Sequence, residues 1–66
     1  MDLKDSLKAM RIERSITQAQ LAKKLNISLK TISHWETGYT EPSITQLIAI
    51  ADLYSVSLDE LVGRNF

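Results

Sequence analysis

Apolar residues recur at helical spacing in five segments of the chain, and each segment starts beside a residue able to cap a helix. The first segment carries Leu3, Leu7 and Met10, with Asp2 as its expected N-cap. The other four open on a hydroxyl side chain, in three cases followed three residues later by Gln or Glu, the capping-box pattern. Alternating runs and Asn-Gly or Asp-Gly turns are absent from the sequence, so it predicts an all-α fold of five helices without strands. The four hydroxyl starts are Thr17 with Gln20, Ser28, Ser43 with Gln46, and Ser57 with Glu60.

The fourth segment has the widest apolar stripe. A stripe this wide predicts a central helix that packs on more than one side. Its members are Ile44, Leu47, Ile48 and Ala51 on one face, with Ile50 and Leu53 widening it.

Residues 17–38 contain two short helical patterns joined by a tight break at Asn26-Ile27. Two helices this close in sequence cannot lie antiparallel, so they are expected to cross at a steep angle. An advance of about 100° per residue along residues 28–37 places Ile32 and Trp35 on one face, which we expect to be buried. Trp35 is also able to stack on bases, but its place beside Ile32 favours the core. The opposite face is polar apart from Leu29, which suits a helix that enters a groove.

The outer face of residues 28–37 offers the groups that base edges recognise. Lys30 can donate to guanine or phosphate, and Leu29 can contact a thymine methyl group. Ser33 and His34 can donate or accept hydrogen bonds. Each residue alone also suits an ordinary solvated surface, but together they favour contact with DNA. His34 is the only histidine and cysteine is absent, so neither a metal site nor a cofactor is expected.

Residues beside this helix are candidates for contact with a phosphate backbone. Gln18 is the first residue of the second predicted helix, where free backbone N–H groups and its own amide can bind phosphate. The start of the fourth helix, at Ser43 and Ile44, offers the same N–H groups. Tyr39 and Thr40 precede that start and carry hydroxyl groups that can reach phosphates. The alternative for each is an ordinary exposed residue.

Glu36 lies at the edge of the predicted buried face, where a carboxylate needs a cation. Arg11 in the first helix is the candidate partner. Breaking such a pair from one side would be costly, because it leaves a buried charge alone.

Length and composition bound the function. Sixty-six residues predict one domain, residues 1–66, and the lack of cysteine favours a reducing compartment. No apolar run approaches the roughly 18 residues of a membrane span, so a soluble cytoplasmic protein without a membrane partner is expected. The sequence has no Gly-rich phosphate loop and no cluster of carboxylates with a base, and the adjacent Asp59 and Glu60 suit the first turn of a helix. An enzyme is therefore not expected.

The net charge is zero, but the charge is unevenly distributed. Residues 1–34 contain seven basic and three acidic residues, a net charge of +4. Residues 35–66 contain one basic and five acidic residues, a net charge of −4. Such polarity can give a neutral protein one basic face for a nucleic acid, although small domains also show uneven charge by chance.

Taken together, these motifs resemble the Cro/repressor type of helix-turn-helix domain, the xenobiotic-response-element class of phage repressors and small bacterial regulators. The resemblance covers residues 3–62 and is specific as a set, whereas any one motif alone is weak. Its elements are Leu7-x-x-Met10-Arg11, Thr17-Gln18-x-x-Leu21-Ala22-x-x-Leu25, Ile27-Ser28-x-x-Thr31-Ile32-x-x-Trp35-Glu36-x-Gly38, Pro42-Ser43, and Leu53-Tyr54-x-Val56-Ser57-Leu58-Asp59-x-Leu61.

The resemblance implies a compact five-helix, lambda-repressor-like DNA-binding domain whose third helix enters the major groove. It implies an internal ion pair between Arg11 and Glu36. It also implies a homodimer that binds a pseudo-palindromic operator in double-stranded DNA, with the dimer contact in the C-terminal helix region. The implied sets are Leu29, Lys30, Ser33 and His34 for bases, Gln18, Thr31, Thr37, Tyr39 and Thr40 for the DNA backbone, and Val56, Leu58, Val62 and Phe66 for the dimer contact.

Several positions depart from the family pattern. Asn26 replaces the glycine that many members have between helices two and three, although Asn also tolerates the left-handed conformation. Leu29 and Lys30 stand where phage repressors often carry Gln, so no base preference can be carried over. Glu41 puts a negative charge in a loop expected near phosphate.

The expected function is a sequence-specific DNA-binding transcriptional regulator, a repressor that acts as a dimer. Few cations are available, so a shallow to moderate dependence of DNA affinity on salt is expected. The alternative is a protein-interaction module, such as an antitoxin or adaptor, that uses the same fold. A separate regulatory partner protein is compatible with either function.

Overall fold

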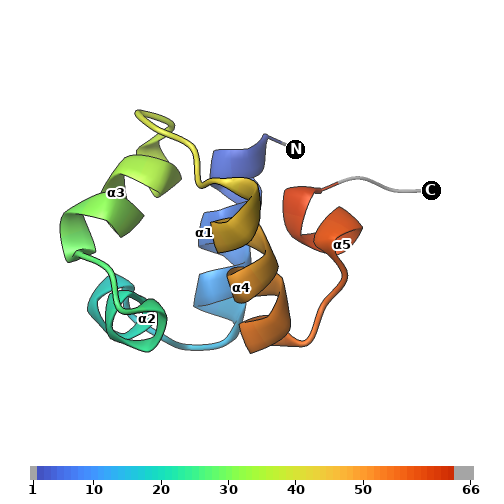
Figure 1. The fold of residues 1–66 in the computed structure, drawn as a ribbon, viewed down its shortest axis with the longest axis horizontal. Coiled ribbons are helices and arrows are strands. Elements are labelled where there is room, and N and C mark those ends of the chain that lie inside the picture. Colours follow the sequence, from blue (N-terminus) through green and yellow to red (C-terminus); the bar gives the residue numbers. More distant parts are fainter. Residues whose placement is uncertain (1, 64–66) are drawn as a thin grey trace.

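Five helices build the chain, and Figure 1 shows their arrangement in a computed structural model that describes residues 2–63. In that view α4 lies in front of α1, with α2 and α3 to one side and α5 to the other. No strand occurs among the described residues, so the predicted all-α fold is confirmed. The helices are α1 (Leu3–Glu13), α2 (Gln18–Leu25), α3 (Leu29–Thr37), α4 (Ile44–Tyr54) and α5 (Leu58–Val62).

Two complete capping boxes start α2 and α4, as predicted. The Thr17 hydroxyl accepts from the Gln20 N–H at 3.0 Å, and the Gln20 side chain accepts from the Thr17 N–H at 2.8 Å. Ser43 and Gln46 repeat both bonds at the start of α4, at 3.2 and 2.8 Å. Each box satisfies two N–H groups that a helix start otherwise leaves without partners.

The other three helix starts are simpler than these boxes. Ser28 accepts from the Thr31 N–H at 3.1 Å, as predicted. Ser57 accepts from the Glu60 N–H at 3.1 Å, but the Glu60 carboxylate accepts from the Ser57 hydroxyl instead of the backbone N–H. The predicted side-chain cap at Asp2 is wrong, because its carboxylate makes no capping bond and instead accepts from Lys4 Nζ at 3.1 Å.

Every helix contributes to one apolar core. The prediction that α4 packs on more than one side is wrong, since Ile44, Ile48 and Leu53 are 64%, 46% and 39% exposed. Only one face of α4 is buried, and the rest of its stripe meets solvent. The buried apolar residues are Leu7, Leu21, Ala22, Ile32, Trp35, Leu47, Ile50, Ala51, Tyr54 and Leu61.

The turn between α2 and α3 depends on Asn26. This residue adopts the predicted left-handed conformation, with φ 57° and ψ 46°. Its N–H donates to the Lys23 carbonyl at 3.2 Å, and the Ile27 N–H donates to the Ala22 carbonyl at 3.0 Å. The turn thereby closes the end of α2 within one residue and sends the chain directly into α3.

The short helix α5 closes the fold against α1. Leu61 is fully buried, and its carbonyl accepts a 2.6 Å hydrogen bond from the buried Ser6 hydroxyl of α1. This bond joins residues 55 positions apart. Among the described helices, none is long and apolar enough to cross a membrane.

Candidate nucleic-acid interface

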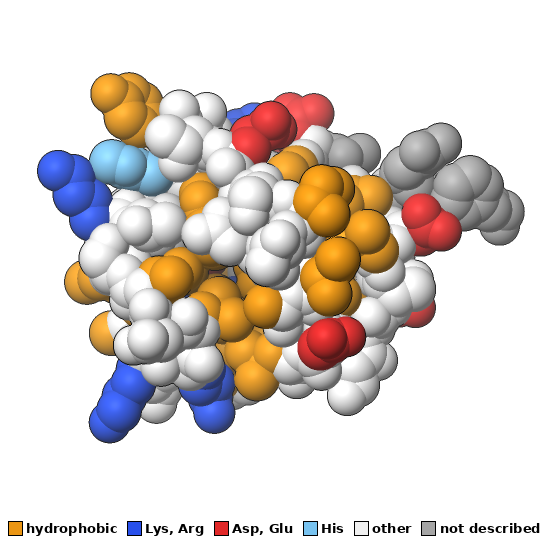
Figure 2. Space-filling view, viewed as in Figure 1, with side chains coloured by type: hydrophobic (Ala, Val, Ile, Leu, Met, Phe, Trp, Pro, Cys, Tyr) orange, Lys and Arg blue, Asp and Glu red, His pale blue; other side chains and the backbone are white. Residues whose placement is uncertain are grey.

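Helix α3 divides into the two faces that its sequence predicts. Ile32 is fully buried and Trp35 is 4% exposed, which confirms their place in the core. On the other side Leu29 is 49% exposed, Lys30 is exposed, and His34 is half-buried, as is Ser33. Figure 2 shows lysine and histidine side chains projecting from the α3 side of the molecule. The core contacts therefore fix which face of α3 a ligand can meet.

A buried ion pair holds α1 and α3 together. Arg11 Nε lies 2.7 Å from Glu36 Oε2, and Arg11 Nη2 lies 3.0 Å from Glu36 Oε1. The two side chains are 11% and 4% exposed. Hydrogen bonding to Glu36 raises the pKa of the Arg11 guanidinium, so Arg11 keeps its positive charge in this pair. A bidentate pair of this kind fixes orientation as well as distance.

Gln18 is attached to the same pair. Its Nε2 donates to Glu36 Oε1 at 3.1 Å, while Arg11 Nη1 donates to the Ile16 carbonyl just before α2. The ion pair therefore connects α1, α2 and α3. An amide nitrogen has two protons, so Gln18 Nε2 keeps a second donor at the start of α2. The sequence predicted the ion pair but missed this link, because no spacing rule connects residues 18 and 36.

Two of the three threonines predicted to contact the DNA backbone use their hydroxyls within α3 or at its N-cap. Thr31 Oγ1 lies 2.8 Å from the capping hydroxyl of Ser28. Thr37 Oγ1 donates to the carbonyls of Ser33 and His34 at 3.0 and 3.3 Å. The Thr37 proton is therefore engaged by its own helix, and its oxygen can only accept.

The loop after α3 folds back onto the helix end. Gly38 adopts a left-handed φ of 81°, and the N–H groups of Tyr39 and Thr40 donate to the His34 carbonyl at 2.9 and 3.3 Å. The Tyr39 ring then lies against the His34 ring, with centroids 4.7 Å apart and planes tilted by 58°. Tyr39 is 77% exposed. The only clue to this pairing in the sequence is Gly38, which lies between the two residues.

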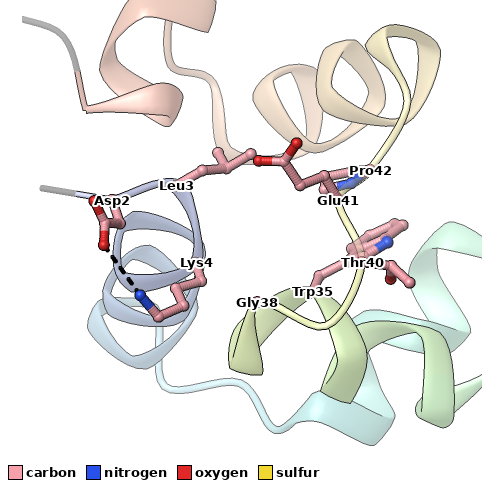
Figure 3. A pocket seen from close by; sticks show the side chains of 8 residues that line it. All are labelled: Asp2, Leu3, Lys4, Trp35, Gly38, Thr40, Glu41 and Pro42. Atoms are coloured by element: carbon pink, nitrogen blue, oxygen red, sulfur yellow. Dashed lines mark hydrogen bonds and ion pairs between the residues drawn. The ribbon is translucent and has the colours of Figure 1, made fainter.

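The N-terminus of α1 meets the same loop, as Figure 3 shows. The Lys4 side chain crosses Gly38, where an added Cβ would lie 2.8 Å from Lys4 Cδ. Lys4 Nζ pairs with Asp2 at 3.1 Å, which raises the pKa of Lys4 and lowers the pKa of Asp2. A hollow of 310 Å³ separates α1 from the loop, and carboxylates of Asp2 and Glu41 line it beside Lys4. The mixed charges of this hollow do not select an anionic or a cationic ligand.

The residues predicted at a dimer contact differ in exposure. Val56 and Val62 are half-buried and pack against the core, whereas Leu58 is 37% exposed. Phe66 lies outside the described residues. The larger apolar surface is on α4, where Ile44 and Ile48 are exposed, and Figure 2 shows apolar side chains gathered over α4 on the side facing α5.

On one face of the molecule, the charge split along the sequence is also a split in space. Residues 41–63 contain four acidic residues and no lysine or arginine. Figure 2 shows basic side chains on the α2 and α3 side and acidic side chains around α4 and α5. The polar face of α3 therefore lies at the basic end of the molecule.

Three curated relatives are transcription regulators. The chain is 39% identical over 64 residues to the cryptic phage CTXphi transcriptional repressor RstR of Vibrio cholerae, covering 97% of this chain and 57% of that one. It is 37% identical over 65 residues to the regulator ImmR of Bacillus subtilis, covering 98% and 51%. The activator BcrR of Enterococcus faecalis is 37% identical over 63 residues, covering 96% and 31%. The chain thus spans 31% of the length of BcrR, 51% of the length of ImmR and 57% of the length of RstR.

Two solved structures share the fold. A transcriptional regulator from Listeria innocua superposes with a TM-score of 0.89 at 31% identity, over 98% of this chain and 61% of that one. The P22 c2 repressor in complex with a synthetic operator superposes with a TM-score of 0.87 at 31% identity, over 98% of both chains. The sequence also matches the helix-turn-helix family over residues 7–61. The chain therefore belongs to the Cro/C1-type helix-turn-helix family, whose members here are regulators of transcription and not enzymes.

Proposed function

We propose that this chain is the sequence-specific DNA-binding part of a transcription regulator, with α3 in the major groove of its operator. One observation carries the proposal: the buried Ile32 and Trp35 turn a polar face of α3 outward, in a fold that matches a repressor bound to its operator over 98% of both chains. The relatives include both a repressor and an activator, and we favour repression. We expect it to act in the cytoplasm, where bacterial DNA lies.

Base reading is assigned to the outer face of α3. Lys30 reaches guanine acceptors, Leu29 contacts a thymine methyl group, and Ser33 and His34 supply donors or acceptors. Lys30 and Leu29 are exposed in the free protein, which supports this role.

Phosphate contacts come from the residues around α3 and position it without reading sequence. Gln18 offers its second amide proton at the start of α2, where the helix dipole also favours an anion. Tyr39 and Thr40 are exposed in the loop and supply hydroxyl donors. Thr31 and Thr37 contribute through oxygens that already hold bonds within α3.

The decisive experiment removes side chains from the reading face. Lys30→Ala with Ser33→Ala should reduce affinity for an operator selected from a random DNA pool by about tenfold or more, because each lost base contact costs about 1–3 kcal/mol. Circular dichroism should show unchanged folding, since both side chains lie outside the core. The matched control is Lys8→Ala with Thr45→Ala, an exposed lysine and threonine elsewhere. A double variant that binds the operator as tightly as the parent would refute the assignment.

We also propose that the protein binds a pseudo-palindromic operator as a homodimer. The contact centres on Leu58, Val62, Val56 and Phe66 and extends to Ile48 and Ile44 of α4, whose exposed apolar area supports an interface. Leu58→Glu should lower the dimer fraction in sedimentation equilibrium, whereas Ala19→Glu at an exposed position of α2 should not. Equal dimer fractions in both variants would contradict this contact.

The exposed apolar side chains of α4 also support the second candidate function, a protein-interaction module. On that reading Ile48→Asp abolishes capture of a separate regulatory partner, while Lys30→Ala with Ser33→Ala leaves capture unchanged. Operator binding that depends on Lys30 and Ser33 favours the DNA-binding function instead.

A further inference from the structure

The contact between His34 and Tyr39 joins a proposed base-reading residue to a residue assigned only to the DNA backbone. The ring centroids are 4.7 Å apart, within the range of favourable aromatic pairs. The rings belong to different elements, since His34 is in the last turn of α3 and Tyr39 follows the Gly38 cap. The pair therefore crosses the boundary between the helix and its loop.

The backbone holds Tyr39 in this place. Its N–H donates to the His34 carbonyl at 2.9 Å, and the same carbonyl accepts from the Thr40 N–H. Gly38 has a left-handed conformation that reverses the chain direction sharply, and the aliphatic part of the Lys4 side chain lies across Gly38. The Tyr39 backbone is thus tied to the residue that its side chain covers.

The covering ring restricts the imidazole. A surface histidine normally samples several side-chain rotamers. An aromatic neighbour at this distance favours one of them by about two- to tenfold. His34 is half-buried while Tyr39 is 77% exposed, so Tyr39 shields His34 from solvent and is itself exposed to solvent. Among the described residues, neither ring nitrogen of His34 makes a hydrogen bond, so the imidazole keeps its donor and acceptor for a ligand.

We propose that Tyr39 is a positioning residue for base recognition, whose ring holds the His34 imidazole in the orientation that reads a base edge. This inference rests on the proposed DNA-binding function and adds a specificity role to a residue otherwise limited to phosphate contact. A base contact depends on the angle of its hydrogen bond, so fixing the ring sharpens discrimination between base pairs.

The first test needs no DNA. His34 is the only histidine, so its imidazole C–H signals are resolved in proton NMR of the intact chain. Tyr39→Ala should move these signals toward those of an uncovered histidine, because the ring current of Tyr39 is lost. Tyr39→Phe should leave them nearly unchanged. Identical signals in all three proteins would show that the rings do not pair in solution and would overturn the proposal.

The second test measures specificity. Affinities for a selected operator and its single-base-pair variants are compared for the parent, His34→Ala, Tyr39→Ala and the double variant. His34→Ala should reduce discrimination at one base pair of each half-site by about fivefold or more. Tyr39→Ala should reduce discrimination at that same base pair, and the double variant should be no worse than His34→Ala alone. Tyr39→Phe should retain the discrimination.

Thr40→Ala is the matched control, since it lies in the same loop and keeps its backbone bond to His34. It should weaken binding equally for every sequence. If Tyr39→Ala behaves like Thr40→Ala, or if the losses at Tyr39 and His34 simply add, Tyr39 contacts only phosphate and the inference fails while the proposed function stands. If the parent protein binds no DNA from the pool, both fail.

Discussion

At the residue scale, the Arg11–Glu36 pair does more than join two charges. Glu36 accepts from both Arg11 and Gln18, and Arg11 also donates to the Ile16 carbonyl. One carboxylate thus sets the relative positions of α1, α2 and α3. A buried pair of this kind specifies geometry more reliably than it adds stability, because desolvation offsets much of the attraction.

Removing one member of this pair should be costly. Arg11→Met should lower the free energy of unfolding by about 3 kcal/mol, since it leaves the Glu36 carboxylate buried without its cation. Urea denaturation measures this loss, and Lys8→Met on the exposed side of α1 is the control. Arg11→Met combined with Glu36→Leu should recover part of the loss. A loss below about 1 kcal/mol for Arg11→Met would mean that the pair behaves like a surface pair.

Tyr54 is a second residue with an energetic consequence. Its ring packs under the Arg14 guanidinium at 4.5 Å, but its buried hydroxyl has no hydrogen-bond partner among residues 2–63. Tyr54→Phe should therefore leave stability unchanged or raise it by about 1 kcal/mol, because an unsatisfied polar group is removed. Urea unfolding at pH 7 measures the change. A loss above about 1 kcal/mol would mean that the hydroxyl binds a partner, such as a buried water.

The same residue makes stability depend on alkaline pH. Burial raises the pKa of Tyr54 above its ordinary value of 10.0, so the folded state holds the phenol proton more tightly than the unfolded chain does. The contribution of the protonated Tyr54 phenol to the free energy of unfolding is fully present below pH 10, the pKa in the unfolded chain. It is lost as the pH rises through the pKa of Tyr54 in the folded protein. Urea midpoints measured from pH 8 upward should fall less steeply in Tyr54→Phe than in the parent. Parallel pH profiles would contradict the shift.

Individual residues were predictable from the sequence where one helix decides their environment. Ile32 and Trp35 fall on the buried side of a single helical wheel, and Glu36 at its edge calls for a cation. The contacts of Gln18 with Glu36 and of Tyr39 with His34 were not predictable. Each depends on how two elements approach, and periodicity along one element carries no information about that approach.

At the scale of elements, helix starts were predictable and helix orientation was only partly so. Capping boxes are local, so Thr17 with Gln20 and Ser43 with Gln46 could be identified from sequence spacing alone. The apolar stripe of α4 was misread because apolar content does not show how much of a helix its neighbours cover. Ile44 and Ile48 lie in the stripe but outside the contact with the core.

The end of α3 tests the role of backbone conformation. Gly38 has a φ of 81°, so Gly38→Ala should lower the free energy of unfolding by about 1–2 kcal/mol. Gly38→Asn should cost less, because Asn tolerates this conformation. Lys4 Cδ also lies close to the new methyl group, but its flexible side chain can move. Combining Gly38→Ala with Lys4→Ala should therefore recover little, and full recovery in thermal unfolding would show that crowding dominates.

At the scale of the whole molecule, the distribution of charge matters more than its sum. On the face that Figure 2 shows, basic side chains lie on the α2 and α3 side and acidic ones around α4 and α5. This polarity orients the neutral protein in the field of an anionic ligand, with the reading face forward. On this face the split in the sequence predicted the polarity, because α2 and α3 come from the basic half of the chain and α4 and α5 from the acidic half.

Glu41 is the acidic residue that immediately follows the loop residues assigned to the DNA backbone, and it is exposed between α3 and α4. Two unit charges roughly 7 Å apart in water repel by about 0.6 kcal/mol, so Glu41→Gln should raise operator affinity about threefold at low salt. The gain should vanish toward 1 M salt, where charges are screened beyond about 3 Å. Asp52→Asn on α4 is the charge-matched control. Fluorescence anisotropy titrations measure both, and equal gains in the two variants would indicate a general charge effect.

The hydrogen bond from Ser6 to the Leu61 carbonyl has a consequence for the timing of synthesis. The donor leaves the ribosome 55 residues before its acceptor. At about 5–20 residues per second, Ser6 waits for roughly 3–11 s with its partner not yet made. The same delay applies to the core, since Leu61 is fully buried in it. Helix α1 is thus translated first, yet it reaches its final environment only after α5 has emerged.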